Sequence, residues 1–255
     1  MSKVTGTRKS KPILSLLIPF RGRPEQIRSV LPILAELSQR KQNTFEVVAV
    51  ELRGSESEKE YVEDLGHTYI HIPCDRTFHK TLALNTALYA SCGEFVVPYD
   101  IDLVPSDGTL ERLANIVQLT DRILFAGYRL MSPLRSVRTI DQVAGSDTSV
   151  GSENAESALY KHLTSGERFG IAPAFERQRL LAVGGWDENY VGWGAEDQDI
   201  IERYLSDGRT LVLSPDLIYY HLHHDRDPLW SEDENVMRNR SYYARNREAK
   251  PQRLT

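Results

Sequence analysis

The chain has 255 residues, of which 40% are hydrophobic and 26% are charged, and its formal net charge is -5. This length is enough to bury one substantial core, and the acidic balance argues against general binding of nucleic acid. The two cysteines show neither a metal-binding nor a redox spacing, which fits reduced thiols in a cytoplasmic protein. No apolar run approaches the roughly 20 residues that span a bilayer, so no transmembrane segment is expected. Peripheral membrane association stays open.

Apolar runs alternate with helical patterns in the first half of the chain. Strands are expected over 13–18, 45–50, 68–72 and 95–97, and helices over 24–37 and 80–90. This alternation predicts an α/β fold in which helices flank a mostly parallel, Rossmann-like sheet. Such a sheet binds its ligands at the carboxyl ends of the strands.

The second half of the chain is less regular. It contains a polar excursion over 132–167, and its tail from Ser231 onward is strongly polar, which predicts either a lid or a surface arm. A short helix is expected over 155–163 within the excursion. It is followed by apolar segments over 169–175 and 180–183, a helix over 200–205 and a last strand over 210–213 that leads through Pro215 to residues 217–220.

Two aspartates, Asp100 and Asp102, come directly after the strand expected over 95–97. Residues two apart in an extended chain point to the same face, so both carboxylates can approach a cation or a ribose. Aspartates are also common at strand ends simply because they accept hydrogen bonds within turns. The position after a buried strand favours a ligand site, since α/β sheets bind nucleotides there.

Three histidines, His221, His223 and His224, follow the last expected strand. With a distant aspartate they would suit Mn²⁺ better than Mg²⁺, because imidazole is a softer ligand than Mg²⁺ prefers. His221 and His223 share a face of a regular strand, whereas pairing His221 with His224 requires a turn, so both pairs remain open. Each ring alone is also consistent with a partly buried, hydrogen-bonded histidine.

A third cluster, Pro19-Phe20-Arg21-Gly22-Arg23, lies at the turn between the first strand and the first helix. Two guanidinium groups beside a helix N-terminus can hold a phosphate or the edge of a nucleobase. Solvated arginines in a loop are the simpler alternative.

A glycine-hinged loop over 184–199 combines tryptophans with acids in the spacing Gly-Trp-Gly-x-Glu-Asp-x-Asp. Such a loop suits a polar ligand held between an aromatic ring and a carboxylate. The plain alternative is a helix start with acids in its first turn, where the helix dipole favours negative charge.

The loop resembles the signature of the β-1,4-galactosyltransferase and bacterial chondroitin-polymerase group of inverting, metal-dependent sugar transferases. Other segments are similar to that group in the same order, and the resemblance extends from about residue 13 to residue 228. These segments are 18–23, 78–85, 100–102, 169–170 and 224–227.

The resemblance implies a GT-A fold and the transfer of galactose or N-acetylgalactosamine from a UDP-sugar to a carbohydrate or glycoconjugate hydroxyl, with Mn²⁺ or another divalent metal. We expect a basic tail over 1–12, a single catalytic domain over 13–230 and a polar lid or arm over 231–255. Within the domain, 13–105 would bind the nucleotide and 106–230 the acceptor.

Matching motifs give each expected site residue a role by resemblance. Asp197 would be the base that takes the proton of the acceptor hydroxyl. The metal ligands would be Asp102, His221 and His224, the UDP-sugar would be bound by Pro19, Phe20, Arg21, Arg23, Lys80 and Asp100, and the acceptor would be bound by Trp193, Gly194 and Glu196.

The chain departs from this group at three positions. Lys80 stands where the group usually has arginine, and His221 stands where the animal enzymes have methionine, which should change metal preference rather than abolish binding. Arg168 occupies the position of their donor-sugar selectivity residue, so galactose does not follow from the resemblance.

Two other functions stay open. One is a transferase related to the polypeptide N-acetylgalactosaminyltransferases or to the family-two polysaccharide synthases, and the other is a non-catalytic module that binds a nucleotide sugar. The presence of Asp102, Asp197 and His224 together weighs against the module, because binding alone needs no base.

Overall fold

The structure is a computed structural model that describes residues 11–40, 44–151, 166, 168–225 and 232–249. Most of the basic tail expected over 1–12 lies outside the described residues. The short helix expected over 155–163 lies outside them as well.

The first half of the chain builds a parallel sheet. β1 (Leu14–Phe20) lies between β2 (Phe45–Arg53) and β4 (Phe95–Pro98), β3 (Thr68–Pro73) pairs with β2, and all three pairings are parallel. Every residue of β1 is buried, because apolar side chains occupy both faces of this central strand. The strands expected here from the apolar runs are confirmed.

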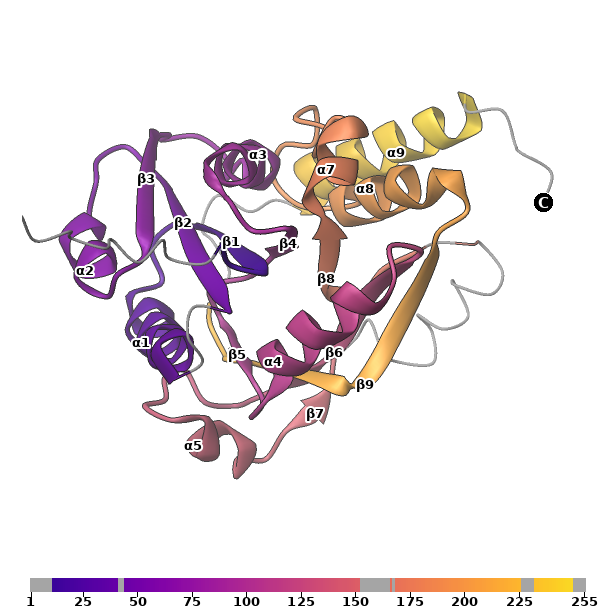
Figure 1. The fold of residues 1–255 in the computed structure, drawn as a ribbon. Helices are drawn as coiled ribbons and strands as arrows, with labels where there is room; N and C mark the ends of the chain where they lie inside the picture. The colour runs from indigo at the N-terminus through magenta and orange to yellow at the C-terminus, as the bar shows by residue number, and fades with distance from the viewer. Residues whose placement is uncertain (1–10, 41–43, 152–165, 167, 226–231, 250–255) are drawn as a thin grey trace, which may run out of the picture.

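The second half continues the same sheet with mixed pairings (Figure 1). β8 (Ile171–Glu176) pairs antiparallel with β4 and with β6 (Ile123–Met131), while β9 (Thr210–His221) runs parallel to β6. β5 (Leu103–Pro105) pairs antiparallel with β9, and β7 (Ser149–Val150) with β6. The α/β class is confirmed, and its sheet is mixed because strands after β4 enter it in both directions.

Helices cover both faces of the sheet, and alternate residues of β1 point to the two layers. Leu16 and Ile18 pack with α1 (Pro24–Arg40) and α4 (Thr109–Ile116), whereas Leu17 packs on the opposite side. That opposite layer contains α3 (Lys80–Ala90), α7 (Arg177–Ala182) and α8 (Glu196–Tyr204). In the described part of the chain, none of the helices has the length and apolar character needed to cross a membrane.

Several elements were not evident from the sequence. The polar segment before β3 contains α2 (Lys59–Asp64), which buries only Val62. α4 and β6 lie in a stretch to which the sequence patterns gave no element, and α5 (Ile140–Ala144) lies in the polar excursion. β9 extends the strand expected over 210–213 through to His221, because it pairs along nearly all of β6 with one irregularity between Ala126 and Tyr128.

The C-terminal tail forms α9 (Met237–Ala249), preceded by a π-helical turn over Glu232–Val236. Figure 1 shows α9 beside α8, on the same side of the sheet as α3 and α7.

Candidate functional site

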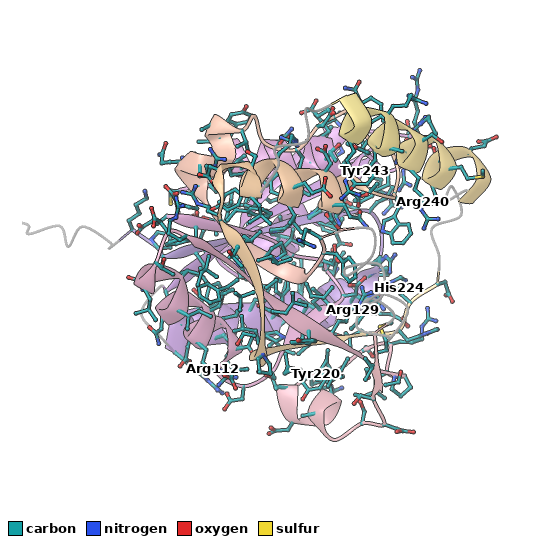
Figure 2. All side chains as sticks on the ribbon, turned by 90° about the vertical axis from the view of Figure 1, so that its right-hand side faces the viewer. Arg112, Arg129, Tyr220, His224, Arg240 and Tyr243 are labelled. Atoms are coloured by element: carbon teal, nitrogen blue, oxygen red, sulfur yellow. The ribbon has the colours of Figure 1, made fainter. Side chains whose placement is uncertain are left out.

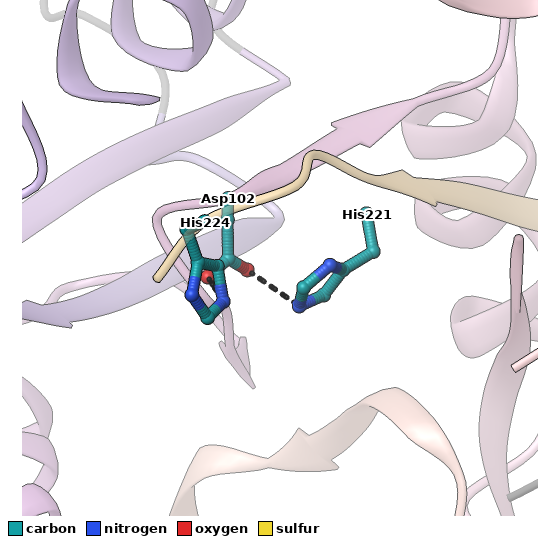
Figure 3. A group of neighbouring side chains, drawn as sticks. All are labelled: Asp102, His221 and His224. Atoms are coloured by element: carbon teal, nitrogen blue, oxygen red, sulfur yellow. Dashed lines mark ion pairs between the residues drawn. The ribbon is translucent and has the colours of Figure 1, made fainter. Parts of the chain in front are cut away.

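Asp102, His221 and His224 lie together at one end of the sheet (Figure 3). Strand pairing brings them there, because Leu103 of β5 lies opposite His221 of β9, and the backbone N–H of Leu222 donates to the carbonyl oxygen of Asp102 at 2.8 Å. His221 Nε2 is 3.5 Å from Asp102 Oδ1, and His224 Nε2 is 3.1 Å from Asp102 Oδ2. One ligand atom from each residue lies within 4.8 Å of the others.

The chemistry of this group fits a divalent metal. Burial alone would raise the pKa of Asp102, but the hydrogen bond from His224 and the nearby charges of His221, His224 and Arg23 hold that pKa below its usual value. Burial lowers the pKa of His221, against the opposing charge of Asp102. An ionised carboxylate and a neutral imidazole are the forms that ligate metals. Asp102 Oδ1 accepts no hydrogen bond from any described residue, which leaves an oxygen for a cation.

His223 lies outside this group. Its backbone N–H donates to the carbonyl oxygen of Leu134 at 2.8 Å, and its side chain is exposed. The turn after β9 is also held by Gln26, whose amide nitrogen donates to the carbonyl oxygen of His223 at 2.9 Å. His224 Nδ1 lies 2.9 Å from the carbonyl oxygen of Asp225, a contact that fixes the orientation of the ring. The geometry therefore favours the pair of His221 and His224 over the pair that includes His223.

The arginine cluster after β1 lies next to the histidine and aspartate group. Arg23 Nη1 is 3.4 Å from Asp102 Oδ2, and the guanidinium group of Arg21 lies 5.6 Å from the centre of the Phe78 ring. Gly22 and Arg23 both adopt a positive φ of 64°, which turns the chain sharply between β1 and α1. Pro19 and Phe20 are buried in β1, so the two arginines form the accessible part of this cluster.

The glycine-hinged loop presents an exposed tryptophan ring beside a carboxylate. Trp193 is 53% exposed and lies between Gly192 and Gly194, whose φ angles of 86° and 116° are unfavourable for other residues. Asp197, in the first turn of α8, has a side chain that is 44% exposed. Glu196 is buried, and its Oε2 accepts from the backbone N–H of Gly194 at 2.7 Å.

Lys80 joins this loop to the aspartates at the end of β4. Its Nζ lies 3.3 Å from Asp197 Oδ2, 3.6 Å from Glu196 Oε1 and 3.8 Å from Asp100 Oδ1. Burial, reinforced by the charge of Asp197, raises the pKa of Glu196 to about 7, against the opposing effect of Lys80. The three carboxylates outweigh burial and raise the pKa of Lys80, which stays charged.

Sequence reasoning gave no role to Thr81 and Asn85, which fix the loop to α3. Thr81 Oγ1 donates to the carbonyl oxygen of Tyr190 at 2.9 Å. Asn85 donates to the carbonyl oxygen of Trp186 at 2.8 Å and accepts from the backbone N–H of Trp186 at 2.9 Å. An asparagine on a mostly apolar helix face was the available signal, because a buried amide needs specific partners.

The tail contacts the other side of the loop through α9, a contact that the sequence did not indicate. Asn239, which is only 1% exposed, donates to the carbonyl oxygens of Val191 at 3.0 Å and Trp193 at 3.2 Å. Tyr242 donates to Asp187 at 2.8 Å. The described part of the tail is thus an arm that packs on the loop. Figure 2 shows Arg240 and Tyr243 of α9 on the same side of the molecule as His224.

Comparisons with known proteins agree with this fold. A family model described as the N-terminal domain of galactosyltransferase matches residues 152–225. Over 202 residues the chain is 24% identical to mouse β-1,4-galactosyltransferase 1 and 22% identical to the human protein, matching 78% of this chain and 38% of each relative. The chain therefore spans well under half the length of these relatives.

Two solved structures of glycosyltransferases are similar to the chain. The crystal structure of GalNAc-T7 with UDP, GalNAc and Mn²⁺ has a TM-score of 0.66 at 14% identity and covers 96% of this chain and 49% of that one. TarS of S. aureus has a TM-score of 0.57 at 16% identity and covers 82% of this chain and 36% of that one. Identities this low establish the fold alone. The GT-A fold class and the resemblance to the galactosyltransferase group are confirmed, and the findings together support a glycosyltransferase.

Proposed function

We propose that this chain, which has a GT-A fold and resembles the β-1,4-galactosyltransferases, transfers a hexose from a UDP-sugar to a carbohydrate hydroxyl with inversion at the anomeric carbon. The proposal rests on the position of Lys80 between the metal-type ligand set and the loop that contains Asp197. Asp102, His221 and His224 form a metal-type ligand set, and Lys80 contacts both Asp100, two residues from that set, and the half-exposed Asp197.

The donor side would bind the UDP-sugar through the residues around Asp102. Arg21 and Arg23 would contact the nucleotide, since guanidinium groups pair well with phosphate oxygens. Asp102, His221 and His224 would hold Mn²⁺, which when bound neutralises charge on the departing diphosphate. The ion pair of Arg23 with Asp102 keeps one of these arginines beside the ligand set. The presence of UDP and Mn²⁺ in the GalNAc-T7 structure supports this assignment.

The acceptor side would bind a sugar on the glycine-hinged loop. Trp193 exposes a flat apolar surface on which a sugar ring can stack, and Glu196 lies close behind it through its bond to Gly194. Asp197 would accept the proton of the acceptor hydroxyl as that oxygen attacks the anomeric carbon. The bond from that carbon to UDP breaks on the opposite side, so the configuration inverts and no covalent enzyme intermediate forms.

The donor sugar is proposed from the resemblance alone. Galactose and N-acetylgalactosamine are the leading candidates, because these are the sugars of the group that the motifs match. Arg168 is exposed in the structure and stands at the group's donor-selectivity position. We therefore expect the choice of donor hexose to depend on this side chain.

A polypeptide acceptor is the second candidate, since the sequence leaves open a relation to the polypeptide N-acetylgalactosaminyltransferases and the fold is shared with GalNAc-T7. A screen that includes both oligosaccharide and peptide acceptors separates the two. A non-catalytic binding module would bind UDP with Mn²⁺ and release nothing from any donor.

The test of the function is UDP release from a panel of UDP-sugars, with and without each acceptor, in the presence of Mn²⁺. The proposal expects acceptor-stimulated release with at least one UDP-hexose, abolished by excess EDTA. Tight UDP binding without release across the whole panel would instead identify a binding module.

A further inference from the structure

Lys80 is a buried cation surrounded by carboxylates. Its side chain is 12% exposed, and its three closest ionic partners are Asp197, Glu196 and Asp100, at 3.3 to 3.8 Å. The charged groups that face it come from two elements packed against α3. Asp100 comes from the turn between β4 and β5, and the other two come from the start of α8. A lysine that served only to bind a phosphate would not need this set of anions.

The backbone around Lys80 is fixed to the same loop that presents Trp193. The backbone N–H of Gly192 donates to the carbonyl oxygen of Phe78 at 3.0 Å, and His79 forms a β-bridge with Gly192. Thr81, the next residue along α3, donates to Tyr190. The ammonium group is therefore held at a constant position relative to the start of α8, which contains Glu196 and Asp197.

Glu196 and Asp197 are adjacent in the chain, so the charge of Asp197 opposes ionisation of the buried Glu196. Glu196 is buried, and the groups that change its charge state are Asp197, Lys80 and the backbone N–H groups at the helix start. Lys80 is thus the neighbouring side chain that favours two negative charges at this position. Without it, Glu196 would hold its proton up to a higher pH.

We propose that Lys80 is a positioning residue whose ammonium group holds the carboxylate of Asp197 toward the acceptor hydroxyl and favours the charged form of the neighbouring Glu196. The inference rests on the proposed function, because it assigns a purpose to the base of that reaction. It also replaces the role in UDP binding that the sequence motif implied for Lys80. Asp197 Oδ2 faces the ammonium group, and the side chain keeps enough exposure to contact an acceptor.

The decisive variant is Lys80→Met, which keeps most of the unbranched side chain and removes the ammonium group with its charge. We expect kcat at neutral pH to fall by at least about tenfold. In the pH profile of kcat, the acidic limb should move to higher pH by about 1 to 3 units, the usual effect of losing one opposite charge at this distance. Activity should recover toward the wild-type rate at alkaline pH. The dissociation constant for UDP with Mn²⁺, measured by calorimetry, should change by less than about threefold.

Two further variants serve as controls. Lys80→Arg restores the charge and should return the acidic limb to its wild-type position, even if the larger group lowers kcat. Arg21→Met removes a cation of the proposed nucleotide side and should raise the KM for the donor without moving the limb. If Lys80→Met instead raises the donor KM or weakens UDP binding and leaves the limb unmoved, Lys80 is a nucleotide contact and the proposal is wrong.

Two more measurements keep the proposal separate from the function and from folding. If the wild-type protein releases no UDP from any donor, carboxyl NMR of the protein without ligands still reports the titration of Glu196, which must shift upward in Lys80→Met; an unchanged titration overturns the proposal. If Lys80→Met does not fold, Lys80→Met/Glu196→Gln removes one charge of each sign. The acidic limb of its kcat profile should lie at a higher pH than that of Glu196→Gln alone. Acidic limbs at the same pH in the two variants would contradict the proposal.

Discussion

His224 Nε2 lies 3.1 Å from Asp102 Oδ2, although the two residues come from distant parts of the chain. The antiparallel pairing of β5 with β9 creates this contact, because it places the residue before β5 beside the end of β9. A metal held here would be bound by His221 at the end of β9 and by two residues in turns, Asp102 and His224, which the pairing of β5 with β9 brings together.

His224→Ala should therefore weaken Mn²⁺ binding by more than the roughly 10- to 100-fold that loss of an outer contact costs. Mn²⁺ affinity can be measured directly by electron paramagnetic resonance, without any substrate. His223→Ala is the matched control, since this exposed ring lies outside the ligand set. The Mn²⁺ affinity of this variant should equal that of the wild type. Equal losses in both variants would remove His224 from the site.

His221→Met should change which metal supports the best activity. Methionine supplies a sulfur in place of an imidazole nitrogen, and the preference among divalent metals follows the softness of the ligands. Activity in a series of Mn²⁺, Mg²⁺, Co²⁺ and Ca²⁺ gives the ranking. The same ranking before and after substitution would show that His221 is not a ligand.

Asp197→Asn should lower kcat by about 10²–10⁴, the usual cost of losing a general base. The amide has nearly the same shape, so UDP binding in the presence of Mn²⁺ should not change. Asp102→Asn should differ from Asp197→Asn in that it impairs UDP binding as well as transfer. Near-normal turnover in Asp197→Asn would assign the base to another residue.

Asn239→Ala should destabilise the protein and weaken acceptor binding. The substitution removes the amide donor to the carbonyl oxygen of Trp193 and one of the two donors to that of Val191, which Arg238 also contacts, and losing such hydrogen bonds costs about 1–3 kcal/mol. The free energy of unfolding in urea and the KM for the acceptor are the two measurements. Arg240→Ala, at an exposed position on the same helix, should change stability by less than about 0.5 kcal/mol. Equal effects of the two variants would mean that α9 does not support the loop.

Acidification should destabilise the fold through His67. This buried ring lies 3.1 Å from the carbonyl oxygen of Leu31 in α1, and burial lowers the pKa of His67 despite that contact. The unfolded chain then binds a proton at a higher pH than the folded one. The stabilising contribution is therefore present above about pH 6.5 and is lost as the pH falls through the folded pKa.

Urea unfolding at several pH values tests this prediction. His67→Gln cannot titrate, so its stability should fall less than that of the wild type between about pH 7 and pH 5. Parallel losses in the two proteins would assign the acid sensitivity to other groups.

The sequence predicted the local motifs well. Asp102 and the arginines after β1 follow buried strands with clear apolar runs, so their place at the carboxyl ends of the sheet followed from periodicity. The GT-A class followed from the order of the motifs rather than from any single one of them. His224 could not be preferred over His223 as the partner of His221 from spacing, because the turn that brings His224 back to Asp102 depends on the pairing of β9 with β5.

Contacts between distant segments could not be predicted. The tail has no apolar stripe, yet α9 packs through Asn239, Tyr242 and an edge contact between the rings of Tyr190 and Tyr242. Polar contacts of this kind leave no periodic pattern. Lys80 was expected to bind the nucleotide, and its carboxylate neighbours became visible only once α3 and α8 were placed side by side.

The configuration of the reaction product tests the central claim most directly. A donor and an acceptor that support Mn²⁺-dependent UDP release would be converted on a preparative scale, and NMR would give the anomeric configuration of the transferred sugar. The account predicts the configuration opposite to that of the donor, formed at a rate that Asp197→Asn lowers by about 10²–10⁴. A product with the configuration of the donor, or one formed at full rate by Asp197→Asn, would contradict direct displacement assisted by this carboxylate.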